Sequence, residues 1–109
     1  MATTYKNARA AVGTSYATVY TCPASTTALV LNAQAANVDG SASADVSAQW
    51  LDDSAADVAT RLVELLTVPA KAAVNVLDGP VILEAGDQFQ AKASATGDIE
   101  LTLAIREDT

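Results

Sequence analysis

Strict alternation of apolar and polar side chains near the C-terminus is the feature that most constrains the fold. The alternation runs through residues 88–95, stops at Thr96-Gly97-Asp98, and resumes from Ile99 to Ile105. A period of two is typical of a strand with one buried face. Two such runs separated by a glycine-containing turn predict a β-hairpin. A short apolar run at 81–83 and an Ala-Gly-Asp turn precede it, so residues 81–105 organise the predicted fold.

The rest of the sequence has the patterns of further short strands separated by turns. Strands are expected over 12–21, 26–36, 44–50 and 73–77, with proline or Asp-Gly in several of the intervening turns. About eight short strands, with turns roughly every 8–12 residues, predict an all-β chain. We expect a single antiparallel β-sandwich or jelly-roll-like domain over 13–109. Residues 1–12 are expected to form an N-terminal arm or an edge strand.

One segment fits two secondary structures. Ser54 to Asp57 fits a capping box, and apolar side chains follow at helical spacing, so residues 55–66 taken alone predict a helix. The same segment also places apolar side chains on one face of a strand, interrupted by Glu64. Because the surrounding chain has β patterns, we prefer a loop over 52–59 and a strand over 60–68.

The core is expected to be thin, because 24 of the 109 residues are alanine and only five are aromatic. Each alanine buries little area, so two layers must approach closely. Gly86 and Gly97 are expected to turn the chain, with positive φ for at least one of them. The apolar faces of the alternating runs predict these inward-pointing side chains: Leu29, Leu31, Val46, Trp50, Phe89, Leu101 and Leu103.

Composition excludes or disfavours several classes of function. The chain has no histidine, which excludes a Ser-His-Asp or Cys-His catalytic arrangement and the usual Cys/His zinc site. The net charge of −7 disfavours direct binding of nucleic acid. Cys22 is the single cysteine, and we expect it to be a buried structural thiol. We predict no enzymatic activity, no cofactor or metal site, no signal peptide and no membrane partner.

Positive charge is concentrated near the N-terminus. Lys6 and Arg9 are the only charged side chains before Asp39, whereas the remaining 71 residues carry four basic and thirteen acidic groups. A basic segment on an acidic body favours docking on a neighbouring protein. We therefore predict that Tyr5, Lys6 and Arg9 contact a partner, with an ordinary edge strand as the equal alternative.

A series of short motifs covers residues 19–107. In order they are Val19 to Ala24, Thr26 to Leu31, Ala36 to Asp39, Trp50 with Asp52, Val68 to Ala70, Asn75 to Gly79, Leu83 to Asp87 and Ile99 to Leu103. In this order and spacing they resemble a family of small virion structural proteins from tailed bacteriophages. The resemblance implies a compact β-sandwich without catalysis, and a strand rather than a helix before Val68.

The same resemblance implies a place in the virion but does not say where on the particle. The protein would be made in the host bacterial cytoplasm and become part of the virion. The function we expect is that of a capsid decoration (cement) protein that binds and stabilises the head shell. Its partners would be the major capsid protein or other virion proteins, with self-association a further possibility. The alternative is a structural or receptor-binding module of the tail, collar or baseplate.

Overall fold

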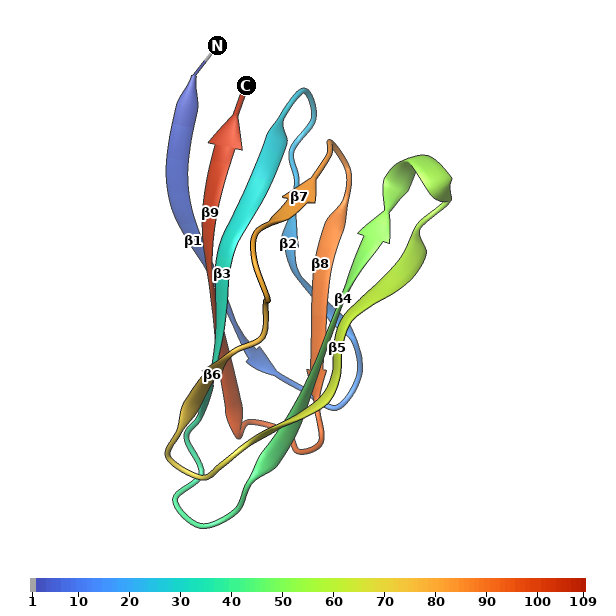
Figure 1. Ribbon diagram of the computed structural model, residues 1–109. Coiled ribbons are helices and arrows are strands. Elements are labelled where there is room, and N and C mark those ends of the chain that lie inside the picture. Colours follow the sequence, from blue (N-terminus) through green and yellow to red (C-terminus); the bar gives the residue numbers. More distant parts are fainter. Residues whose placement is uncertain (1) are drawn as a thin grey trace.

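The computed structural model describes residues 2–109, which form two antiparallel sheets packed face to face (Figure 1). In the first sheet the order is β1-β9-β3, with the short strands β6 and β7 both pairing with β3; in the second sheet the order is β2-β8-β4-β5. The prediction of an all-β antiparallel sandwich is confirmed. The bounds are β1 Thr3–Val12, β2 Ala17–Thr21, β3 Thr27–Asn37, β4 Ala44–Asp52, β5 Val58–Val68, β6 Ala73–Asn75, β7 Val81–Leu83, β8 Gln88–Ala93 and β9 Ile99–Asp108.

The predicted hairpin over residues 81–105 is wrong, although its two main strands exist. β8 pairs with β2 and β4 in one sheet, and β9 pairs with β1 and β3 in the other. Residues 94–98 therefore carry the chain from one sheet across to the other. Alternation shows that each strand has one buried face, but it does not say which strand lies beside it. The apolar faces of β8 and β9 lie across the core from each other, on opposite layers (Figure 1).

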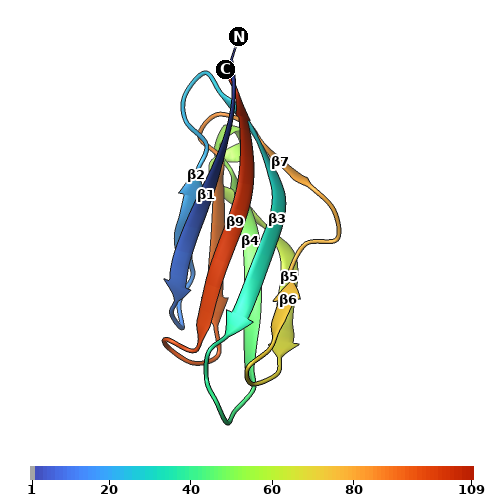
Figure 2. The same ribbon diagram turned by 90° about the vertical axis from the view of Figure 1, so that its left-hand side faces the viewer.

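The first strand forms one edge of the sandwich. Residues 3–12 pair with β9 in one unbroken antiparallel register, from Thr3 opposite Asp108 to Val12 opposite Ile99. The predicted arm also includes Met1, which lies outside the described residues. Figure 2 looks onto the outer face of this sheet, with β1, β9 and β3 side by side and both chain ends at the same end of the molecule.

The predicted face of β3 is wrong in its first half. Ala28 and Val30 are fully buried, whereas Leu31 is 41% exposed and Leu29 is partly exposed. The cause is a β-bulge, because the register with β9 shifts between Val30 and Asn32. After the bulge Ala33 and Ala35 face inward, as the alternation from Leu29 and Leu31 predicts. A run that is apolar on both faces gives no signal for a bulge.

The core is rich in small side chains, as expected. Seven alanines are buried in it, and they surround larger residues from both sheets. Four of the seven predicted core residues are buried: Val46, Phe89, Leu101 and Leu103. Trp50 packs against the core but remains partly exposed. Both predicted turn glycines have positive φ, with 89° at Gly86 and 81° at Gly97.

The ambiguous segment is a strand, as preferred. β5 extends over Val58–Val68, and the turn before it holds a short 3-10 helix, η1, at Asp53–Ala55. The expected capping box does not start an α-helix. Instead the Asp52 carboxylate accepts hydrogen bonds from the backbone N–H and the hydroxyl of Ser54. Ala56 and Asp57 then adopt left-handed backbone conformations that reverse the chain into β5.

Candidate functional site

β1 presents the three predicted docking residues, but it divides them between two sides. Tyr5 lies opposite Arg106 and Arg9 opposite Thr102, so both point to the outer face of the sheet. Lys6 lies opposite the buried Ile105 and therefore points to the inner side. Tyr5 is 69% exposed. Among the described residues Arg9 forms no ion pair, so Tyr5 and Arg9 remain available to a partner.

Lys6 belongs to a network that joins the two sheets. Its ammonium lies 3.2 Å from a carboxylate oxygen of Glu107 in β9. The same carboxylate oxygen accepts a hydrogen bond from the hydroxyl of Tyr20 in β2. Glu107 and Tyr20 are both buried, whereas Lys6 closes the network from solvent. Sequence analysis missed this network, because 87 residues separate its two buried members and no local spacing connects them.

The network shifts the titration of both buried members. The Tyr20 hydrogen bond, supported by Lys6, holds the pKa of Glu107 below its ordinary value against the opposing effect of burial. Burial is the main cause that raises the pKa of Tyr20, and the Glu107 charge raises it further. The hydrogen bond therefore joins a carboxylate to a neutral phenol at neutral pH. This arrangement stabilises the packing of β1 and β9 against β2.

A shallow groove runs beside Tyr5 on the outer face of the same sheet. Its volume is about 190 Å³, and Leu31 faces it because of the bulge in β3. Further across the sheet Ile82 of β7 is 63% exposed and lies opposite Leu29. The lining residues are Tyr5, Lys6, Asn7, Leu31, Ala104 and Ile105. Alternation alone predicted Leu31 to lie in the core, so the exposed apolar side chains on this outer face could not be predicted from the sequence.

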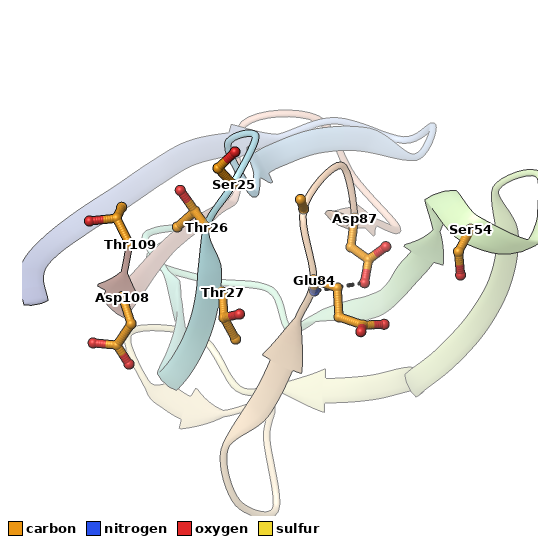
Figure 3. A pocket seen from close by; sticks show the side chains of 9 residues that line it. Ser25, Thr26, Thr27, Ser54, Glu84, Asp87, Asp108 and Thr109 are labelled. Atoms are coloured by element: carbon orange, nitrogen blue, oxygen red, sulfur yellow. Dashed lines mark hydrogen bonds between the residues drawn. The ribbon is translucent and has the colours of Figure 1, made fainter. Parts of the chain in front are cut away.

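A larger depression of about 610 Å³ lies at the end of the sandwich that carries the C-terminus (Figure 3). Its carboxylates do not form a catalytic pair. Asp87 is buried, and its two oxygens accept hydrogen bonds from the backbone N–H groups of Asp53 and Glu84. It therefore joins two turns. The lining residues are Ser25, Thr26, Thr27, Ser54, Glu84, Ala85, Asp87, Asp108 and Thr109.

Two further features bear on chemistry. The Cys22 thiol is buried and donates a hydrogen bond to the carbonyl of Thr26, 3.3 Å away, and burial raises its pKa. A buried thiol with a raised pKa is a weak nucleophile. Within residues 2–109 no cluster of three or more acidic or cysteine side chains is placed to hold a metal ion. The same residues contain no helix long and apolar enough to cross a membrane.

The outer face of the second sheet is covered by side chains that bind one another. A chain of hydrogen bonds crosses all four strands, and its members are Arg61, Gln49, Gln90, Thr18 and Gln88. The ring of Tyr16 lies beside this chain, with the Lys92 ammonium 4.9 Å and the Arg61 guanidinium 5.2 Å from its centre. The members of this chain are thus satisfied within the molecule, whereas the Tyr16 hydroxyl has no hydrogen-bond partner among the described residues.

Comparison with solved structures finds a similar fold in a phage capsid structure. The chain is similar to one in the acidic stable capsid structure of Helicobacter pylori bacteriophage KHP30, with a TM-score of 0.55 and 10% identity over 98% of this chain and 87% of that chain. A pentameric capsid protein isolated from metagenomic phage sequences also matches, with a TM-score of 0.41 and 17% identity over 95% of this chain and 59% of that chain.

The sequence itself has no such match. No protein-family model matches the chain, and no curated protein is significantly similar in sequence. The likeness to the KHP30 chain therefore concerns the fold, because 10% identity is too low to carry over individual residues. This likeness of fold is consistent with the family of virion structural proteins that the sequence motifs resemble.

Proposed function

We propose that the protein is a non-enzymatic structural component of a bacteriophage virion, and specifically a capsid decoration protein that binds the head shell and stabilises it. The observation that supports this is the shared fold with a chain of the KHP30 capsid structure over nearly the whole length of both chains. The motifs over residues 19–107 point independently to the same class of protein. The major capsid protein is the proposed partner.

The physical properties of the chain suit this role. A shell protein of this kind must stay dispersed before assembly, and a net charge of −7 on 109 residues favours that. A ligand that binds only the assembled, folded shell stabilises it by mass action. The fold offers the outer face with Tyr5 and Leu31 for such contacts. Tyr5 and Arg9 remain the predicted docking residues, whereas Lys6 is engaged by Glu107.

Copy number in purified particles tests the proposal. A decoration protein is expected in hundreds of copies per head, quantified by mass spectrometry against the major capsid protein. Particles that lack the protein should release their DNA at lower temperature, and purified protein added back should restore the stability. A protein absent from purified particles would contradict any role in the virion.

Copy number per particle also distinguishes the alternative function, a module of the tail, collar or baseplate, from decoration of the head. A tail, collar or baseplate module would be present in a handful to a few dozen copies and would remain with purified tails rather than with heads. Its loss would leave the thermal stability of the head unchanged and would reduce adsorption to the host.

A further inference from the structure

The open side of β1 carries a regular row of backbone hydrogen-bonding groups. Ala2 and Thr109 exchange both of their backbone hydrogen bonds, which fixes the phase of the ladder between β1 and β9. In an antiparallel ladder such pairs alternate along the strand, so the even-numbered residues of β1 bond to β9. The N–H and C=O groups of the odd-numbered residues, from Thr3 to Ala11, therefore point away from the sheet.

Apart from its two basic side chains, the sequence of β1 does not protect this edge. Natural edge strands are usually short, or they contain charged side chains, a proline, a bulge or an inward-pointing charge that prevents pairing. β1 has ten residues, no proline or glycine, and no register shift along its whole length. Its one inward-pointing charge, Lys6, is neutralised by Glu107. Tyr5, Asn7, Arg9 and Ala11 are all exposed.

We propose that β1 pairs with β1 of a second copy of this chain, antiparallel, with Asn7 at the two-fold axis. The odd-numbered residues that face the open edge then pair with one another, as the ladder requires. Asn7 lies opposite Asn7 of the second copy, and Tyr5 lies opposite its Arg9. Five residue pairs give about ten hydrogen bonds, which is the number in a typical protein interface. The first sheets of the two copies join into one continuous sheet.

The side chains of β1 are self-complementary in this register. Tyr5 and Arg9 both point to the outer face, so each tyrosine ring lies beside the guanidinium of the other copy, twice across the two-fold axis. The two Arg9 side chains are four residues apart along the strands, roughly 13 Å. That separation exceeds the screening length of about 8 Å at physiological salt. Lys6 lies opposite Ala8 and is a diagonal neighbour of Lys6 of the second copy, and Glu107 of its own copy neutralises each of these two lysines.

The charge of β1 does not prevent pairing with a second copy. Lys6 and Arg9 are the only charged side chains of the strand, and Glu107 of the same copy neutralises Lys6. This inference does not depend on the proposed role in the virion, because the pairing is expected for the purified protein.

Sedimentation equilibrium of the full chain tests the proposal. Wild-type protein is expected to show a monomer–dimer equilibrium. Asn7→Pro removes one N–H from the open edge and none from the ladder with β9, so it should raise the dimer dissociation constant at least tenfold, about one decade on the affinity scale. Asn7→Ala is the matched control, because it keeps the N–H and should dimerise like the wild type.

A charge variant tests the predicted register. Arg9→Glu removes the cation beside the tyrosine of the second copy and should weaken dimerisation about tenfold. Lys71→Glu makes the same change of charge in the turn between β5 and β6, far from β1, and should leave dimerisation unchanged. Equal weakening by both variants would show a general charge effect and would overturn the proposed register.

Crosslinking decides the case if Asn7→Pro fails to fold. The Cα atoms of a directly opposed hydrogen-bonded pair lie about 5.5 Å apart, within reach of a disulfide. Asn7→Cys should therefore form a covalent dimer on mild oxidation. Thr102→Cys is the matched control, since Thr102 is exposed on the same face one strand inward and should stay monomeric. The native Cys22 is buried and should not react.

Two results would overturn the proposal. One is a wild-type protein that stays monomeric up to about 1 mM, the limit of weak association, with no crosslink through Asn7→Cys. The other is a dimer that persists unchanged in a folded Asn7→Pro variant, because a different surface would then hold it. A monomeric protein whose Asn7→Pro variant no longer binds phage heads would assign the edge to a shell protein instead of a second copy.

Discussion

The two long edge strands of the sandwich, β1 and β5, have similar lengths, but β1 pairs regularly with its neighbour and β5 does not. β1 follows β9 in an unbroken register over ten residues. β5 has eleven residues and shifts its register against β4 twice, once near Leu65 and once near Leu62. At the first shift Leu65 adopts a φ of 54°, and its N–H bonds to the hydroxyl of Ser47 instead of a strand carbonyl. Arg61 and Glu64 add exposed charges to β5.

The difference shows how one domain can protect one edge and leave the other free. Bulges twist a strand and interrupt the row of groups that a foreign strand would use, so β5 is a poor template for pairing. β1 has neither bulges nor unpaired inward charge. Its stability comes from the inner side, where β9 contributes a row of fully buried apolar residues and Lys6 is fixed by Glu107. The following predictions test this contrast, beginning with the largest expected effect.

Substitution of Leu101 should lower stability more than any other change considered, because its buried side chain packs in the core beneath β1. Its side chain is 1% exposed and lies opposite Ala10. Leu101→Ala should lower the free energy of unfolding by about 2–5 kcal/mol. Leu62→Ala in β5 is the matched comparison, and a loss of about 1–2 kcal/mol is expected because that side chain is only partly buried. Urea denaturation measures both values. Equal losses would mean that the two edges rest on equally packed cores.

Gly86 should rank second. It lies in the turn between β7 and β8 and packs against Asp53, in the turn that leads into β5. A Cβ atom at Gly86 would lie 2.6 Å from a carboxylate oxygen of Asp53, and the φ of 89° already disfavours any other residue. Gly86→Ala should cost about 2–3 kcal/mol, from backbone strain and the displacement of Asp53. Gly97→Ala shares the positive φ but meets no atom within 4 Å. Its cost should be only about 1–2 kcal/mol, the backbone strain alone. Thermal unfolding of the two variants gives the difference, and a Gly97→Ala cost equal to that of Gly86→Ala would exclude the contact with Asp53.

The Tyr20–Glu107 bond, which joins β2 to β9, should make the stability of the fold depend on pH. Because the folded state lowers the pKa of Glu107 below its ordinary 4.5, the bond stabilises the fold fully above that pH, and the stabilisation is lost as the pH falls further. The pKa of Tyr20 is raised above its ordinary 10.0, so stability should also fall as the pH rises beyond 10. Tyr20→Phe should cost about 1–3 kcal/mol at pH 7, because it removes a hydrogen bond to a charged group.

Unfolding free energies measured from pH 2.5 to 11 test this expectation. The Tyr20→Phe variant should lose less stability than the wild type on both the acidic and the alkaline side. Thr18→Val provides a control in the same strand, since Thr18 bonds to Gln88 on the exposed outer face. Its pH profile should match that of the wild type. A Tyr20→Phe profile parallel to the wild type would show that the pair does not control the pH dependence.

The fold class could be predicted from the sequence because alternation reports burial directly. The runs at Phe89 to Ala95 and Ile99 to Ile105 identified both strands and the buried faces of each, although β8 ends at Ala93. Their pairing was missed, since a five-residue connection suits a hairpin and a crossing between sheets equally well. The bulge at Leu31 was missed for a similar reason: with Leu29, Val30 and Leu31 all apolar, either register buries an apolar row.

The candidate site was predictable only in part. The isolated positive charges of Lys6 and Arg9 marked β1 as distinct, and Tyr5 is exposed as a docking residue must be. The roles of Lys6 and Arg9 differ because strand alternation sends them to opposite sides. That difference depends on where β9 lies, and the partner strand is a long-range property. Glu107 likewise sits in what the sequence presents as a polar tail, and only the fold brings it to Tyr20.

Substitutions at Leu65 should change the free energy of unfolding least. They measure what the bulge that protects the β5 edge costs the fold. Its backbone is left-handed at φ 54°, which costs a non-glycine residue roughly 1–2 kcal/mol, and its side chain is 62% exposed and contributes little burial. Leu65→Gly relieves the strain but loses chain entropy, so a net gain of up to about 1 kcal/mol is expected. Leu65→Ala removes the same side chain and keeps the strain, so it should be neutral or slightly destabilising. Chemical denaturation of the two variants separates the backbone contribution from the side-chain contribution. If Leu65→Gly were no more stable than Leu65→Ala, the bulge would carry no strain, and the irregular β5 edge would cost the fold nothing.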